Sequence, residues 1–496
     1  MVDFLKIDNL NNNIAKSRPA FGLSDSTPTF VNIVNQYTGN QQNKNSNLPD
    51  NAAYRVLPTR NNTIDSSNYS KMFSQLSDFV DNESKKHLQT LHETKKLLSN
   101  NSNDNSTTIE NLYKIMTESR TGGFDPKIIL KEALKTLADP YIITQDFGKI
   151  PEVIIPQLIT EENTRVQSKF EEEKNYPASP FEKKELLKTI TPTDIDFNKG
   201  HTCPAASIEF DLADKKPAEF VRYLEKLTSP DKCVKTKIKY SNIADDMPAA
   251  ISKLQDWKID YKKLNADNIE ITLRPDENAY PRAIIQEYGR AKDSRSVVDS
   301  LLQSTFMQVG SEKTYNSLTD LRSEDTGNGR GLNQEEGAFI ESIVDYEGGK
   351  DSVTYMDLDE NLTKINKYNF DPQATEAQLT ETLNRGKNIM VGFLTDVDEK
   401  GNLVSANGHE VLLTGIVQDK AGEKFFKYND TDDGDNYAPS FIKVSELIRT
   451  LHHANLPKDV IRKYIPPQRD ARLSLIGDYW QLKSHNASAP VQQAQA

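Results

Sequence analysis

One cysteine in this sequence has neighbours that would turn its thiol into a nucleophile. Cys203 follows the polar stretch 198–202 and precedes Pro204 and a run of alanine and apolar residues that predicts a helix. Proline suits the first turn of a helix because its missing N–H would have no partner there. Cys203 would therefore stand at a helix N-terminus, where free N–H groups and the helix dipole favour the thiolate. The same pattern also suits an ordinary buried cysteine at a helix start.

A histidine that would serve as the base for this thiol lies much further along the chain. His409 stands at the start of the apolar run 408–416, which predicts a strand, and the next predicted strand ends in Asn429 and Asp430. In neighbouring strands, an amide or a carboxylate at that end would orient the imidazole, which would then deprotonate Cys203. Successive strand residues point to opposite faces, so only one of the two should reach the ring. We favour Asp430, because a carboxylate also stabilises the imidazolium.

The chain order of cysteine, histidine and then amide or carboxylate resembles the papain-like cysteine peptidases, and most closely their C39-like branch. In that branch a cysteine caps a helix, a Gly-His pair opens a later strand, and an Asn-Asp pair follows at the end of the next strand. The Gly-His pair at 408–409 and the Asn-Asp pair at 429–430 match this pattern. The resemblance covers residues 197–212 and 383–451.

This resemblance implies an α+β, papain-like fold, with a helical subdomain that carries the cysteine and an antiparallel sheet that carries the base. It implies that Cys203 is the nucleophile and His409 the base, with Asp430 or Asn429 orienting the imidazole. These families place a glutamine shortly before the nucleophile to bind the oxyanion. The nearest amide here is Asn198, which we expect to take that role beside the Cys203 N–H. The implied substrate is a protein or peptide, and no cofactor or metal is implied.

Three other functions fit parts of the same pattern. A thiol acyltransferase of the transglutaminase type uses the same order of residues but passes the acyl group to an amine. A catalytically inactive papain-like module would use the same fold for binding. A zinc site built from His201, Cys203 and Cys233 is disfavoured, because no fourth ligand follows at the spacing of a zinc finger.

Composition limits the binding partners and the cellular compartment that we expect for this protein. The 496 residues carry a formal net charge of −12, which argues against nucleic acid or an anionic membrane as the main partner. The two cysteines are too few for a disulfide framework. No run of about 18 apolar residues is present, so we expect no membrane span. The first residues lack the pattern of a Sec signal peptide, so we expect a cytoplasmic protein or one exported by a route without that signal.

The distribution of apolar residues predicts four parts. Residues 1–68 and 485–496 lack a repeating apolar face and should be disordered. Residues 69–190 should form a helical region and a linker, and residues 191–484 the peptidase domain. His409 follows Cys203 by about 200 residues, against about 130–150 in papain-like enzymes, so we expect a helical insertion at about 290–370. We also predict a strand over 388–394, and we place His452 and His453 on a helix that begins near Ser445.

Overall fold

The computed structural model describes residues 65–121, 124–146, 163–164, 202–239, 242, 269–289, 294–311, 314–317, 320–322, 331–345, 349–358, 365–368, 371–395, 408–432 and 438–464. Within these ranges the chain is a mixture of helices and antiparallel strands, so the prediction of an α+β fold is confirmed. The predicted disordered segments at 1–68 and 485–496 lie outside the described residues, apart from residues 65–68.

The main α-helices of the described residues are α2 (Ser66–Phe79), α3 (Asn82–Glu93), α4 (Thr108–Thr117), α5 (Pro126–Ala138), α8 (Cys203–Lys215), α9 (Pro217–Leu227), α11 (Ala279–Gly289), α12 (Val297–Gly310), α13 (Gln334–Val344), α14 (Pro372–Asn384), α15 (Val444–Thr450) and α16 (Lys458–Tyr464). Local sequence fixes several of their starts. Thr107, Ser296 and Asn333 each form a reciprocal capping box with the residue three positions on, which begins α4, α12 and α13.

The strands are β1 (Val234–Ile238), β2 (Ile269–Leu273), β3 (Tyr315–Asn316), β4 (Leu321–Arg322), β5 (Lys350–Thr354), β6 (Met356–Leu358), β7 (Ile365–Tyr368), β8 (Ile389–Leu394), β9 (Gly408–Gln418), β10 (Lys424–Asn429), β11 (Ser440–Lys443) and β12 (Leu451–Pro457). Six of them form one sheet in the order β11-β10-β9-β8-β12-β5. All five pairings in this sheet are antiparallel. The strands predicted at 388–394, 408–416 and 424–430 are its centre, and they are confirmed as β8, β9 and β10.

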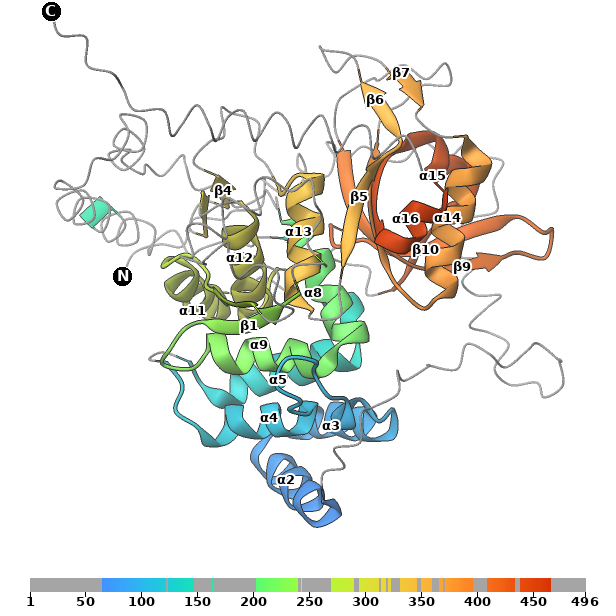
Figure 1. The fold of residues 1–496 in the computed structure, drawn as a ribbon. Coiled ribbons are helices and arrows are strands. Elements are labelled where there is room, and N and C mark those ends of the chain that lie inside the picture. The colour runs from blue at the N-terminus through green and yellow to red at the C-terminus, as the bar shows by residue number, and fades with distance from the viewer. Residues whose placement is uncertain are drawn as a thin grey trace, which may run out of the picture. The chain divides into compact units, whose positions relative to one another are not determined.

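Both faces of the six-stranded sheet are buried at its central strands β8 and β12. Val391 on β8 and Val411 on β9 point to one face, where they join an apolar core with α14, α15 and α16. Met390 and Leu412, one residue away, point to the other face and belong to the core of the helical part. Figure 1 shows α14, α15 and α16, in orange to red, beside the strands of the sheet. A strand that is apolar on both faces reads as a continuous hydrophobic run, which is why β8 was clear in the sequence.

The helical part has one continuous apolar core. It extends from Leu76 on α2 through the helices α3, α4, α5, α8, α9 and α12 to Ile340 on α13. Phe210 on α8 and Phe306 on α12 are among its largest buried side chains, and each such side chain contributes about 1.5–3 kcal/mol through burial. The helix that begins with Cys203 is therefore held from several sides, and the position of the cysteine is fixed with it.

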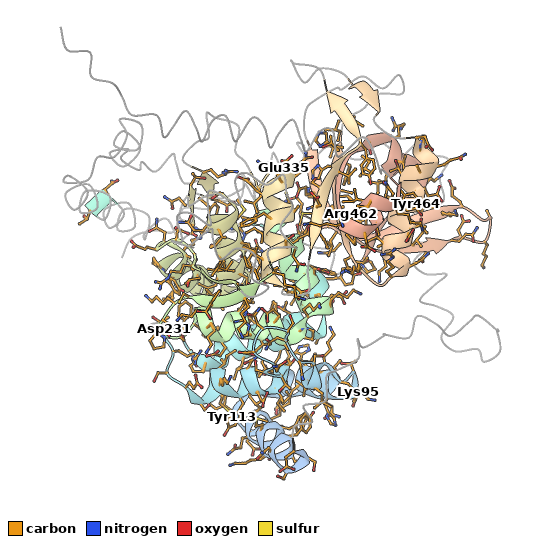
Figure 2. All side chains as sticks on the ribbon, viewed as in Figure 1. Lys95, Tyr113, Asp231, Glu335, Arg462 and Tyr464 are labelled. Atoms are coloured by element: carbon orange, nitrogen blue, oxygen red, sulfur yellow. The ribbon has the colours of Figure 1, made fainter. Side chains whose placement is uncertain are left out.

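Helix α16 is tied to α14 across their polar surfaces. The hydroxyl of Tyr464, which Figure 2 labels together with Arg462 on the same helix, donates a hydrogen bond to Oε2 of Glu381 at 2.7 Å. Lys463 contacts the same carboxylate oxygen, also at 2.7 Å. These contacts fix the last described helix against the outer layer of the sheet.

The prediction of a helix over His452 and His453 is wrong. Helix α15 ends at Thr450, and the chain continues as strand β12, which pairs with β8 and β5. Almost every residue of β12 is buried, so the strand lacks the alternation that identifies a strand in sequence. Its apolar residues then read as a continuation of the helix before it.

Gly392 makes room for His453 in the centre of the sheet. A Cβ atom at Gly392 on β8 would lie 2.1 Å from Cε1 of the His453 ring. The ring is buried, and its Nε2 lies 3.2 Å from Oε1 of Glu410, the residue after His409. Gly415 on β9 differs, because a Cβ atom there would meet nothing within 4 Å.

We expect Gly392→Ala to lower the free energy of unfolding by about 1–3 kcal/mol, since the His453 ring must move within a packed interior. Gly415→Ala is the matched control on the neighbouring strand and should change stability by about 0.5 kcal/mol or less. Urea unfolding of both variants measures the difference. Equal stability of the two would contradict the close packing of His453 against Gly392.

Candidate active site

Cys203 lies in the first turn of α8, as its proline and alanine neighbours predict. Thr202 is the N-cap residue, and its carbonyl oxygen accepts the first helical hydrogen bond from the N–H of Ala206 at 2.8 Å. The first turn holds no acidic side chain, so the positive end of the helix dipole acts on the sulfur without an opposing charge in that turn. Cys203 is half-buried, whereas Cys233 is buried.

The imidazole of His409 connects the thiol to a carboxylate. Nε2 of His409 lies 2.7 Å from Oδ1 of Asp430, and the side chain of Cys203 is the second hydrogen-bonding partner of the ring. Because the carboxylate occupies Nε2, Nδ1 is the nitrogen left for the sulfur. The Phe393 ring, opposite His409 on β8, meets the imidazole edge to face with centroids 6.0 Å apart. Two polar partners and one aromatic wall therefore fix the ring.

A bulge in the sheet determines which end residue of β10 reaches His409. Lys427 pairs with Gly415 of β9, but the next residue, Tyr428, pairs with Leu413, so the register shifts by one. After such a shift, each later side chain of β10 points to the face of the sheet opposite to the one that it would otherwise face. Asn429 consequently lies opposite Leu412 and is buried, and its Nδ2 has no hydrogen-bond partner among the described residues.

The side chain of Asp430 is the one that touches the imidazole. Its Oδ1 also accepts a hydrogen bond from the N–H of Asp432 at 3.1 Å. Of the two residues that the sequence left open, the structure places Asp430 beside His409 and Asn429 on the opposite face of the sheet.

The three side chains shift one another's proton affinities. Burial would lower the pKa of His409, but the hydrogen bonds to Asp430 and Cys203 outweigh it and raise that pKa well above its usual value. The pKa of the Cys203 thiol is raised by burial, and the hydrogen bonds from His409 and from the Glu410 N–H reduce that rise without reversing it. The pKa of Asp430 is lowered: burial acts to raise it, and the contact with His409 overcomes this. Asp430 therefore stays ionised and holds a proton on the imidazole.

Sequence reasoning missed a segment that borders the site. Gln145 donates its backbone N–H to the carbonyl oxygen of Thr431, directly after Asp430, at 2.9 Å. Its own carbonyl oxygen accepts from Arg295, whose guanidinium also contacts Thr202, directly before Cys203. The Gln145 side chain is buried, and its Oε1 has no hydrogen-bond partner among the described residues. It lies far upstream of Cys203 in sequence and within the region read as a linker, so no motif identified it.

Two residues considered from sequence, Asn198 and His201, lie outside the described residues. Within the ranges that the structure describes, no group of three or more His, Cys, Asp or Glu side chains is placed to hold a metal ion. No helix in the same ranges combines the length and apolar character needed to cross a membrane. No protein-family model matches the chain, and no curated protein matches it. The functional argument therefore depends on the geometry of Cys203, His409 and Asp430.

We predict that the thiol of Cys203 depends on His409 for its reactivity. Near pH 6, iodoacetamide should alkylate Cys203 faster than Cys233, which is buried. His409→Ala removes an interaction that lowers the thiol pKa, so alkylation of Cys203 should require a higher pH. Asp430→Ala should also shift alkylation of Cys203 to higher pH. Without the carboxylate, the pKa of His409 falls, so the imidazolium that favours the thiolate is lost at a lower pH.

Asn429→Ala is the matched control for this experiment, since Asn429 neighbours Asp430 and points away from the imidazole. It should leave the pH dependence of alkylation unchanged. Peptide mass spectrometry resolves the two cysteines. Equal alkylation rates for both cysteines near pH 6, or an identical pH profile in His409→Ala, would count against an ion pair at this site.

Proposed function

We propose that this protein is a cysteine peptidase of the papain-like type, related in its pattern to the C39-like branch, which hydrolyses peptide or isopeptide bonds. The observation that supports this most directly is the array of Cys203, His409 and Asp430. A thiol at a helix N-terminus, an imidazole and a carboxylate follow one another through hydrogen bonds. This is the arrangement that nucleophilic acyl transfer requires.

In the proposed reaction the thiolate of Cys203 attacks the carbonyl carbon of the scissile bond, and the carbonyl oxygen becomes an oxyanion. The imidazolium of His409 then gives its proton to the leaving amine, and a thioester remains on the sulfur. His409, now neutral, takes a proton from a water molecule that attacks the thioester. The acid product leaves, and the thiolate of Cys203 and the imidazolium of His409 are restored. Asp430 remains ionised throughout and keeps Nε2–H of His409 in place.

The oxyanion requires hydrogen-bond donors near the sulfur. The backbone N–H of Cys203 is one, as part of the free N-terminal turn of α8. Gln145 is a residue with a side-chain amide whose backbone contacts both Thr431 and Arg295, the partner of Thr202. Gln303 also lies there, but its Oε1 accepts from Thr202 and its Nε2 donates to Thr144 and Glu209. We therefore include Gln145 in the proposed site beside Asn198.

The single substitutions Cys203→Ala and His409→Ala should each remove nearly all turnover, and the double variant should lose little more, because the two side chains act as one unit. Asp430→Ala should lower kcat by orders of magnitude, and Asn429→Ala should lower it much less. The measurement is cleavage of a peptide library, read by mass spectrometry. Full activity in Cys203→Ala would overturn the proposal. Amide products that appear only when an amine is added would assign the site to acyl transfer instead.

Gln145→Glu keeps the size of the side chain but replaces a donor with a negative charge. If the amide binds the oxyanion, kcat should fall by about 10²–10³ while KM changes little. Gln145→Asn shortens the side chain but keeps the donor and should lose less. Steady-state kinetics on a peptide identified in the library separate kcat from KM. A Gln145→Glu variant with the wild-type kcat would remove Gln145 from the site.

A further inference from the structure

A buried arginine lies behind the nucleophile and contacts three separate segments of the chain. Arg295 precedes α12 and is almost fully buried. Its guanidinium donates to both carboxylate oxygens of Asp320, at 2.9 and 3.1 Å. It also donates to the carbonyl oxygen of Gln145 at 2.7 Å and to Oγ1 of Thr202 at 2.7 Å. A guanidinium presents its donors in a rigid plane, so these partners are held at fixed positions relative to one another.

Thr202 makes the link to the nucleophile. Its hydroxyl accepts from Arg295 and donates to Oε1 of Gln303 at 2.7 Å. The hydroxyl does not cap its own helix, although threonine at an N-cap position commonly does. It points instead to Gln303 on α12 and to Arg295, which precedes that helix, so the residue directly before Cys203 is fixed by side chains from another part of the chain.

The other end of the network reaches the carboxylate of the site. Gln303 donates through Nε2 to the carbonyl oxygen of Thr144 at 2.9 Å. Thr144 and Gln145 in turn both donate to the carbonyl oxygen of Thr431, through a hydroxyl at 3.2 Å and a backbone N–H at 2.9 Å. Thr431 follows Asp430. One set of buried hydrogen bonds therefore runs from the residue before the nucleophile to the residue after the carboxylate.

We propose that Arg295 and Thr202 are positioning residues that set the distance between Cys203 and the His409–Asp430 pair. This inference rests on the proposed function, because it assigns the network a role in the same site. Neither the Arg295 nor the Thr202 side chain touches a reacting atom of the proposed site. Their effect passes through the backbone on either side, so losing them should misplace the sulfur relative to the imidazole, and a displacement of about 1 Å can cost about 10²-fold in rate.

A purely structural role for the network makes a different prediction. Removing one partner of a buried ion pair destabilises a protein by about 3–5 kcal/mol wherever the pair lies. Arg222 provides the comparison, since it is equally buried and is paired with Glu219 on α9, with Nε to Oε2 at 2.9 Å. If the network acts only on stability, substitutions of Arg222 and of Arg295 should both lower the stability of the protein. Neither should then change the reactivity of the Cys203 thiol in the folded protein.

The decisive variants are Thr202→Val, which removes the hydroxyl without introducing or removing a charge, and Thr202→Ser, which keeps it. We expect Thr202→Val to slow iodoacetamide alkylation of Cys203 and to lower kcat/KM by tenfold or more through kcat. Thr202→Ser should restore most of both. Arg295→Lys keeps the charge but cannot bridge the same partners and should resemble Thr202→Val, whereas Arg222→Lys should resemble wild type in both assays.

The outcomes separate this inference from the proposed function. Alkylation needs no substrate, so a wild-type protein that cleaves no peptide would overturn only the function, and the alkylation rates would still test the positioning role. If wild type cleaves peptides and Thr202→Val matches it in kcat and in alkylation, the positioning role is overturned alone. An equal loss in Arg222→Lys and Arg295→Lys would also overturn it. If Arg295→Lys does not fold, the two Thr202 variants decide the question.

Discussion

The hydrogen bond between Nε2 of His409 and Asp430 is the contact on which the geometry of the site depends. It joins two neighbouring strands at their ends, and the bulge after Lys427 makes it available, because the shift turns Asp430 rather than Asn429 toward the ring. With Nε2 taken, the imidazole has one orientation left for the sulfur. The sheet therefore holds the imidazole and its carboxylate, and the helical part has to bring Cys203 to them.

Where the helical part meets the sheet, charged and polar side chains are buried between them. Lys350 on β5 forms an ion pair with Glu341 on α13 at 2.5 Å, and Asn455 on β12 donates to the same carboxylate. Arg295 and Asp320 form another ion pair, and both of its side chains are almost fully buried. Buried ion pairs contribute little net stability, because removing the charges from water costs free energy. A buried charge that lacks its partner is costly, however, so each pair restricts how its two segments can pack. The helices and the sheet can consequently meet in few arrangements.

The sequence predicted the parts of the site that have local signals. Pro204 after the cysteine marked the helix start, and the apolar strand with His409 at its beginning marked the position of the candidate base. The choice between Asn429 and Asp430 depended on a bulge, which leaves no reliable trace in a run of strand residues. Gln145 and Arg295 belong to long-range polar contacts that follow no spacing. Strand β12 was missed for the related reason that burial on both faces removes the alternation.

The distance in sequence between the halves of the site has a consequence during synthesis. Cys203 and its helix are made long before β9, so the nascent chain contains the thiol without its base. At about 5–20 residues per second, translation from Cys203 to His409 takes on the order of ten to forty seconds. Over that interval the sulfur has a helix N-terminus but no imidazole to take its proton. Until the last strands of the sheet pair, the thiol of a nascent chain therefore lacks the hydrogen-bonding partner that it has in the folded protein.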